Sequence, residues 1–184
     1  WIHIPVGYFK TMHNPSVDWC YKTEPDQTMN GRSIRYPRGK TLGGSSSING
    51  LLYIRGQSRD YDIWRQLGNT GWGWDDVLPY FIKAENQERG QNEFHGVGGP
   101  LSVSDQRIQL PLLNEFQNAA EEFGIPKTQD FNTGDNYGCG YFQVTEKDGF
   151  RCSTAVGYLN PIKNRKNLSI ITNAHVKKIN FENK

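Results

Sequence analysis

The stretch Tyr36-Pro37-Arg38-Gly39-Lys40-Thr41-Leu42-Gly43-Gly44-Ser45-Ser46-Ser47-Ile48-Asn49-Gly50 decides how the rest of the chain is interpreted. It combines four glycines with three consecutive serines. Gly43 and Gly44 carry no Cβ, so the backbone can adopt positive φ and a ligand can approach its N–H groups. The serines can cap a helix that begins there, and free N–H groups at such a start attract phosphate. These residues predict an anion-binding turn.

Two common phosphate motifs do not describe this stretch. No Gly-Lys-Ser/Thr triplet closes it, so the spacing differs from that of a P-loop, and GxGxxG is also absent. The alternative is a Gly/Ser-rich surface loop that binds nothing.

Size and composition set broad limits on the fold and on the partners. The 184 residues suffice for one domain or parts of two, and 35% are hydrophobic. Five tryptophans, nine tyrosines and nine phenylalanines suit a pocket for a flat cofactor. The net charge of +2 gives no reason to propose nucleic acid or an anionic membrane surface as a partner.

The cysteines and histidines indicate neither a disulfide framework nor a metal site. Three cysteines are an odd number, and their spacing fits no zinc pattern. The four histidines lack metal-ligand spacing, so no metal is expected. No run approaches the roughly 18 apolar residues of a membrane helix, and no signal peptide is visible. We expect a cytoplasmic protein with reduced thiols, and peripheral association with a membrane is a further option.

The residues after the Gly/Ser stretch add a family resemblance. The run Gly39 to Asn49, followed by Tyr53, Gly56 and Asp62, resembles the first signature of the glucose–methanol–choline (GMC) oxidoreductases, which are FAD-dependent alcohol oxidases and dehydrogenases. The approach to it is also similar to the family, through Asp18-Trp19, Thr23-Glu24-Pro25 and Asn30-Gly31-Arg32. The overall sequence resembles choline dehydrogenase-like and alcohol dehydrogenase-like members.

The resemblance implies a fold of the α/β class with mixed α+β character. It would be part of a discontinuous Rossmann-like FAD-binding domain through which a substrate-binding domain is threaded. Residues 1–62 would belong to the FAD side, 63–149 would surround the substrate cavity, and 150–184 would return to the FAD side.

The resemblance also assigns residues to the cofactor. Thr41, Gly43, Gly44, Ser45 and Ser46 would follow the FAD pyrophosphate and ribityl chain. Asn49, Gly50, Leu51 and Leu52 would lie beside the flavin ring, although Leu51 and Leu52 are equally well explained as core residues. The backbone of Val176 would hold the adenine, whereas a valine in a strand is otherwise typical of a core. Some members attach FAD covalently through a histidine just before the position of Asn49. Ile48 takes that place here, so non-covalent FAD is expected.

The function implied is oxidation of a primary alcohol to an aldehyde, with hydride transfer to flavin N5. The alcohol and the electron acceptor (O2, a quinone or another) stay open. Neither end of the chain reads as a natural terminus, and the family's GxGxxG turn would precede Trp1. The catalytic base is expected beyond Lys184, so no catalytic residue is assigned, and residues 1–184 alone are expected to hold FAD weakly and to be inactive. The alternative function is a non-catalytic module that binds a nucleotide or another anion.

Periodicity and turn residues predict the local structure. The clearest helix spans 111–123, and Gly124 ends it. Asp60 and Asp75 are expected as N-caps of two further helices. Arg151 and His95 lie in runs that resemble segments of the family, and from this resemblance Arg151 is expected to form an ion pair and His95 to be structural. The remaining expectations are a hairpin between Tyr21 and Ile34, a loop over 86–100, strands over 101–103, 141–145, 167–172 and 174–181, and a helix over 151–159.

Overall fold

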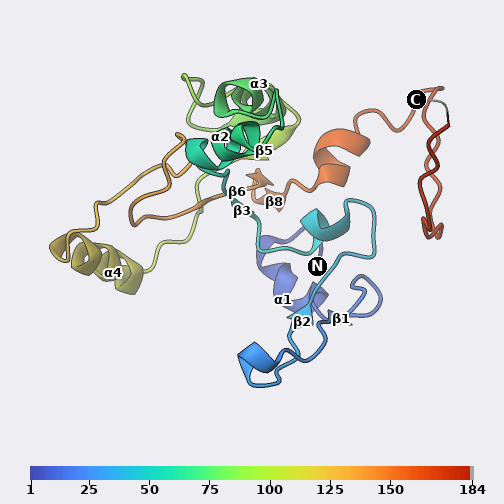
Figure 1. Cartoon of the computed structure of the whole chain (residues 1–184), viewed down its shortest axis with the longest axis horizontal. Coiled ribbons are helices and arrows are strands. Elements are labelled where there is room, and N and C mark those ends of the chain that lie inside the picture. The colour runs from blue at the N-terminus through green and yellow to red at the C-terminus, as the bar shows by residue number, and fades with distance from the viewer. Residues whose placement is uncertain (183–184) are drawn as a thin grey trace.

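The computed structural model describes residues 1–182 and shows short helices and strands joined by long connections (Figure 1). The α-helices are α1 (Tyr8–Thr11), α2 (Ser58–Gln66), α3 (Trp74–Ala84) and α4 (Pro111–Glu122). The strands are β1 (Tyr21–Lys22), β2 (Arg35–Tyr36), β3 (Leu52–Tyr53), β4 (Glu85–Gln87), β5 (Leu101–Val103), β6 (Gln143–Val144), β7 (Glu146–Lys147) and β8 (Phe150–Arg151). Among these residues, no helix has the length and apolar character needed to cross a membrane.

The N-terminal part contains the predicted hairpin. Strand β1 pairs antiparallel with β2, and Tyr21 lies opposite Tyr36. Asn30 (φ 57°) and Gly31 (φ 68°) adopt the left-handed conformation that turns the chain. The hairpin delivers the chain to Gly39, which forms an isolated bridge with Asp18. The start of the Gly/Ser stretch is thus anchored to the preceding segment.

The N-caps of helices α2 and α3 lie three and two residues before the expected positions. Asp60 accepts a hydrogen bond from Gln57 N (2.8 Å), and Asp76 accepts one from Gly73 N (3.0 Å). Gln57 and Gly73 are therefore the cap residues, and the predicted caps Asp60 and Asp75 are wrong. In each helix the carboxylate sits three residues inside and reaches back to the cap, the acidic half of a capping box.

Two short sheets meet at the centre of the molecule. Strand β3 pairs antiparallel with β6, and β4 pairs parallel with β5. Ser104 and Val144 exchange two backbone hydrogen bonds of 2.9 Å, which join the sheets. Strand β4 lies at the start of the region predicted as a loop over 86–100. The prediction missed this strand because its sequence is polar and its burial depends on tertiary contacts. The predicted strands over 101–103 and 141–145 are confirmed as β5 and β6.

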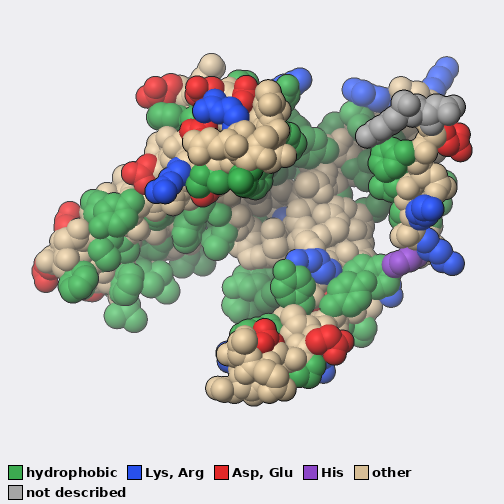
Figure 2. All heavy atoms as spheres, viewed as in Figure 1, with side chains coloured by type: hydrophobic (Ala, Val, Ile, Leu, Met, Phe, Trp, Pro, Cys, Tyr) green, Lys and Arg blue, Asp and Glu red, His purple; other side chains and the backbone are tan. Residues whose placement is uncertain are grey.

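Helix α4 confirms the predicted helix, and Gly124 follows it at φ 96°. The helix lies apart from the other elements, at the left of Figure 1, with none of its residues buried. Its apolar side chains are exposed, with Leu112 at 79% and Phe116 at 65%. Figure 2 shows hydrophobic side chains covering this lobe.

The C-terminal part differs most from the prediction. Arg151 belongs to β8, and a π-helical turn covers only Ala155–Leu159 of the helix expected over 151–159. The two strands expected over 167–172 and 174–181 do not form within the described residues, where this segment is extended without a ladder. Alternation of apolar residues predicts one buried face, but a strand also needs a hydrogen-bonding neighbour. Among residues 1–182, Ile171 (80% exposed) and Ile179 (70%) have no such neighbour and no apolar surface that covers them.

Candidate functional site

The Gly/Ser stretch folds into a tight turn that depends on its glycines. Gly43 (φ 87°) and Gly44 (φ 53°) both adopt positive φ, and a 3-10 turn follows over Gly44–Ser47. A Cβ on Gly39 would lie 2.1 Å from the carbonyl oxygen of Gly44, so the two arms of the turn touch. A Cβ on Gly43 would lie 2.4 Å from Ser47 Oγ. Glycine is therefore required at Gly43 by contact as well as by φ, and at Gly39 by contact alone.

The turn leaves three successive backbone donors available. Within residues 1–182, the N–H groups of Thr41, Leu42 and Gly43 donate to no protein acceptor. The neighbouring N–H of Lys40 is used, since it donates to Val17 O at 2.7 Å. Adjacent free N–H groups around left-handed glycines form a concave anion-binding site. This geometry agrees with the predicted anion-binding turn.

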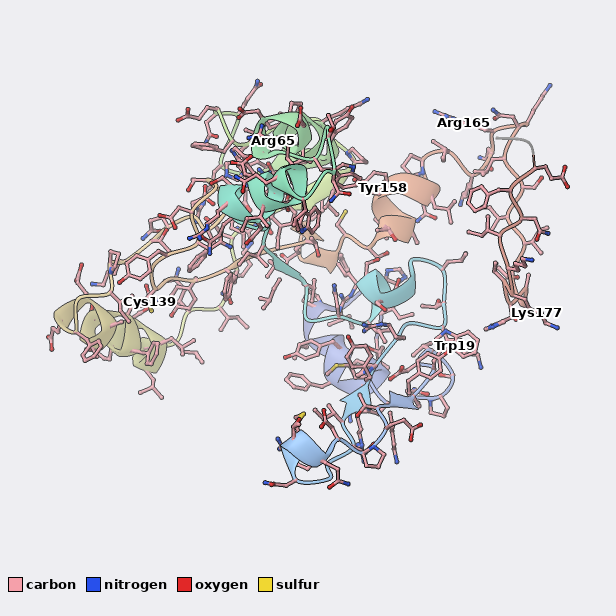
Figure 3. All side chains as sticks on the ribbon, in the orientation of Figure 1. Trp19, Arg65, Cys139, Tyr158, Arg165 and Lys177 are labelled. Atoms are coloured by element: carbon pink, nitrogen blue, oxygen red, sulfur yellow. The ribbon has the colours of Figure 1, made fainter. Side chains whose placement is uncertain are left out.

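The same turn borders a cavity of about 890 Å³. One wall comes from the turn and the segment before it, and the other from the extended C-terminal segment; the lining residues are Ser16, Trp19, Gly39, Lys40, Thr41, Leu42 and 171–175. Trp19 contacts both walls. Its ring packs edge-on against His175, with 5.8 Å between the ring centroids, and the Lys40 ammonium lies 5.0 Å from the Trp19 ring centroid. In Figure 3, Trp19 lies on the side of the N-terminal lobe that faces the C-terminal segment. The cavity has a size typical of small-molecule sites and a cation at its edge.

The predicted phosphate-side residues lie in the turn but play different roles. Thr41 lines the cavity. Ser45 Oγ accepts from Gly39 N (3.2 Å), and Ser46 Oγ donates to Gly43 O (2.6 Å) and accepts from Thr154 N (2.9 Å). The two hydroxyls thus brace the turn from within.

The residues predicted for the flavin-ring and adenine ends of FAD differ in how exposed their side chains are. Leu51 is buried (3% exposed) at φ 65°, and its carbonyl accepts from Thr145 N. Leu52 is 55% exposed, so only Leu51 fits the core alternative. Gly50 is exposed, with open space where a Cβ would stand. Val176 is 75% exposed and lies just after the residues that line the cavity.

Arg151 corrects the expectation of an ion pair. Its side chain is buried (2% exposed) and, among the described residues, meets no carboxylate. Its Nε donates to Ile2 O (2.8 Å), and one terminal nitrogen donates to Ser46 O (3.1 Å) and Asn49 Oδ1 (2.7 Å). The other terminal nitrogen is buried with no partner in residues 1–182. Burial lowers the pKa of Arg151, since the charged form loses solvation.

A second buried cluster surrounds His95, and no sequence motif predicted it. Glu85 is fully buried and accepts from Arg55 (2.9 Å) and from His95 Nδ1 (2.9 Å). Asp130 faces the other ring nitrogen of His95 at 2.7 Å. A carboxylate at each nitrogen requires both to donate, so His95 carries a positive charge. Burial by itself lowers the pKa of His95, but the hydrogen bonds to Asp130 and Glu85 outweigh it and raise the value to about 9. The cluster confirms His95 as structural, because it fastens β4 to the loop after it.

Comparison with known proteins places this geometry in a family. The sequence profile of the GMC oxidoreductase family matches residues 13–184. The chain belongs to the GMC oxidoreductase family. The family resemblance seen at the Gly/Ser stretch is therefore confirmed, and it extends over nearly the whole sequence.

Curated GMC relatives align with the complete chain. An alcohol dehydrogenase [acceptor] from Pseudomonas putida is 42% identical over 184 residues, which are 100% of this chain and 33% of the relative. An oxygen-dependent choline dehydrogenase from Brucella anthropi is 41% identical over 170 residues, 92% of this chain and 31% of the relative. The chain spans about a third of the length of these curated relatives.

Solved GMC-type structures share the fold. Pyridoxine 4-oxidase from Mesorbium loti superposes with a TM-score of 0.84 at 32% identity, over 93% of this chain and 34% of that chain. An FAD-dependent oxidoreductase from Chaetomium thermophilum gives 0.78 at 27% identity, over 90% and 30%. The mixed helices and strands thus fit part of an α/β FAD-binding domain, as the sequence predicted.

Proposed function

We propose that the chain forms one wall of an FAD site in a GMC enzyme that oxidises a primary alcohol to an aldehyde. The observation that carries the proposal is the row of free N–H groups at 41–43 beside Lys40, on a cavity of about 890 Å³. A pyrophosphate needs such donors and a nearby cation, so the residues present fit this part of FAD. The relatives named as alcohol and choline dehydrogenases support the substrate class.

Within this proposal, each segment of the turn has a task. Thr41 and Gly43, with Leu42 between them, present backbone donors to the pyrophosphate. The N–H of Gly44 closes the turn by donating to Thr41 O (2.8 Å), and the hydroxyls of Ser45 and Ser46 keep the turn rigid. Asn49 and Gly50 face the flavin ring, with Leu51 and Leu52 beside them. Val176 marks the adenine end, near the cavity wall at 171–175.

FAD, when bound, would accept a hydride from the alcohol carbon. The hydroxyl proton needs a base, and no residue of this chain takes that role in the proposal. In this proposal, the residues of this chain bind the cofactor, orient it and exclude water from it. We also propose that the FAD is non-covalent, because Ile48 offers no nucleophile, and that residues 1–62 and 150–184 flank a substrate-side segment at 63–149. A cytoplasmic location stays a prediction.

The test uses the complete polypeptide that contains residues 1–184. Purified protein is expected to show flavin absorption bands, which bleach without oxygen when a primary alcohol is added. Repeating the assay with O2 or with a quinone as acceptor separates oxidase from dehydrogenase. Flavin that binds but is never bleached by any alcohol would favour the non-catalytic module, and failure to take up FAD would refute the proposal.

A matched pair of lysine variants ties the result to this cavity. Lys40→Met removes the cation at the cavity edge and is expected to weaken FAD binding about tenfold, the effect of one charge-assisted contact. Lys10→Met removes an exposed lysine of α1, outside the cavity, and is expected to leave FAD affinity unchanged. Equal affinities in both variants would show that the anion site lies elsewhere.

A further inference from the structure

Arg151 is a buried cation that nothing in the described residues neutralises. It lies behind the Gly/Ser turn, 2% exposed, and its contacts are the carbonyls of Ile2 and Ser46 and the side chain of Asn49. Burying a charge in this way is costly, because carbonyl dipoles only partly replace water. Replacing Arg by a neutral residue would have avoided the cost.

The contact with Asn49 fixes the direction of its amide. Asn49 Oδ1 accepts from Arg151 (2.7 Å) and from Leu51 N (3.1 Å). The opposite orientation would aim the Asn49 NH2 group at two N–H donors, so only one orientation is compatible with these neighbours. The NH2 group therefore points away from both of these donors. Within residues 1–182 it donates to no acceptor, and Asn49 is exposed.

The same amide also holds the backbone next to it. The bond from Leu51 N to Asn49 Oδ1 closes an Asx turn across Gly50. Leu51 adopts φ 65°, which costs a non-glycine residue about 1 kcal/mol. Burial of Leu51 and the bond from Thr145 N to its carbonyl hold that conformation in place. Arg151, Asn49 and Leu51 thus form one rigid unit at the end of the turn.

We propose that Arg151 is a positioning residue, which locks and polarises the Asn49 amide so that its NH2 group donates to the flavin ring. This inference rests on the proposed function, since it takes the flavin to lie beside Asn49. A hydrogen-bond donor whose acceptor atom already faces a cation is a stronger donor, because the dipoles reinforce each other. A strengthened donor at the ring stabilises the electron-rich reduced flavin more than the oxidised form.

The test measures the flavin itself in the complete polypeptide. Arg151→Met removes the cation and frees the Asn49 amide to rotate. The reduced flavin is expected to lose about tenfold in binding relative to the oxidised form, which lowers the two-electron potential by about 30 mV. The absorption maximum of the bound oxidised flavin is expected to shift as well. Arg151→Lys keeps the charge and is expected to restore part of the potential.

A second variant guards against simple misfolding. Asn49→Asp keeps an oxygen for Leu51 N and for Arg151 but has no NH2 group, and its carboxylate pairs with the guanidinium. It is expected to be at least as stable as the parent protein and still to lower the flavin potential about as much as Arg151→Met. Asn30→Asp, in the hairpin turn away from the cavity, adds the same charge as a control and is expected to leave the potential unchanged.

The outcomes separate the two proposals. Parent protein that takes up no FAD would refute the proposed function. Parent protein that holds FAD, together with unchanged potentials and spectra in both Arg151→Met and Asn49→Asp, would refute only the role of Arg151. A potential that falls in Asn30→Asp as much as in Asn49→Asp would also refute it, since the effect would then be one of net charge.

Discussion

Raising the pH above neutrality is expected to loosen the cluster around His95. Its imidazole lies between Glu85 and Asp130, which raise its pKa from 6.5 to about 9. The folded state therefore keeps a proton that the unfolded chain releases between these values. The stabilisation is fully present below pH 6.5 and is lost as the pH rises through about 9.

The size of the effect follows from the two pKa values. Each unit of pKa difference is worth about 1.4 kcal/mol, so the difference between 6.5 and about 9 corresponds to about 3 kcal/mol. The pKa of Asp130 behaves in the opposite sense: burial raises it, but His95 and Asn132 N outweigh burial and lower it below 3.8. Its contribution is present at neutral pH and is lost only in acid. The cluster is therefore expected to be most stable between about pH 4 and 6.5.

Hydrogen exchange read by mass spectrometry measures this locally in the complete polypeptide. Peptides covering 85–96, after correction for the intrinsic exchange rate, are expected to lose roughly a hundredfold in protection between pH 6.5 and 9. His95→Gln is expected to remove this pH dependence, whereas His3→Gln, an exposed histidine outside the cluster, is expected to keep it. Constant protection across the range, or the same decline in His95→Gln, would refute the charged state of His95.

Three further predictions concern the turn and its cofactor. Gly43→Ala places a Cβ 2.4 Å from Ser47 Oγ at φ 87°, and it is expected to lower the free energy of unfolding, measured by thermal unfolding, by roughly 2–4 kcal/mol. Gly44→Ala at φ 53° meets open space and is expected to lower it by about 1 kcal/mol. Equal losses would contradict the contact argument. Asp18 accepts three backbone N–H bonds, from His13, Cys20 and Arg38. Burial raises the pKa of Asp18, but these bonds outweigh burial and lower it. Asp18→Ala is expected to lower the free energy of unfolding by roughly 1–3 kcal/mol, measured by urea unfolding at pH 7. Acid precipitation is expected to release all flavin into the supernatant, and yellow pelleted protein would show that a covalent bond forms despite Ile48.

The site could be predicted in part because its chemistry is local. Gly43 and Gly44 supply positive φ wherever they occur in the chain, and their neighbours in sequence complete the turn. The family signature lies in the same stretch, so the resemblance and the observed turn coincide. Helix α4 was equally predictable, since a 3.6-residue period and a following glycine act within one segment.

Predictions that needed a distant partner failed or stayed open. The strand expected over 174–181 has the right alternation, but no neighbouring strand pairs with it in the described residues. Strand β4 was missed because a polar sequence became buried through Arg55 and His95. Arg151 was expected to meet a carboxylate, yet its partners come from residues 2, 46 and 49.

The sequence alone determined the turn, the family and the class of cofactor to expect, because each depends on residues that are adjacent in the chain. Only the tertiary structure decided which polar groups face inward. It brought Arg151 against Asn49 across 102 positions and His95 against Asp130 across 35. Such pairings depend on which segments pack together in three dimensions, and no local pattern of residues encodes that choice.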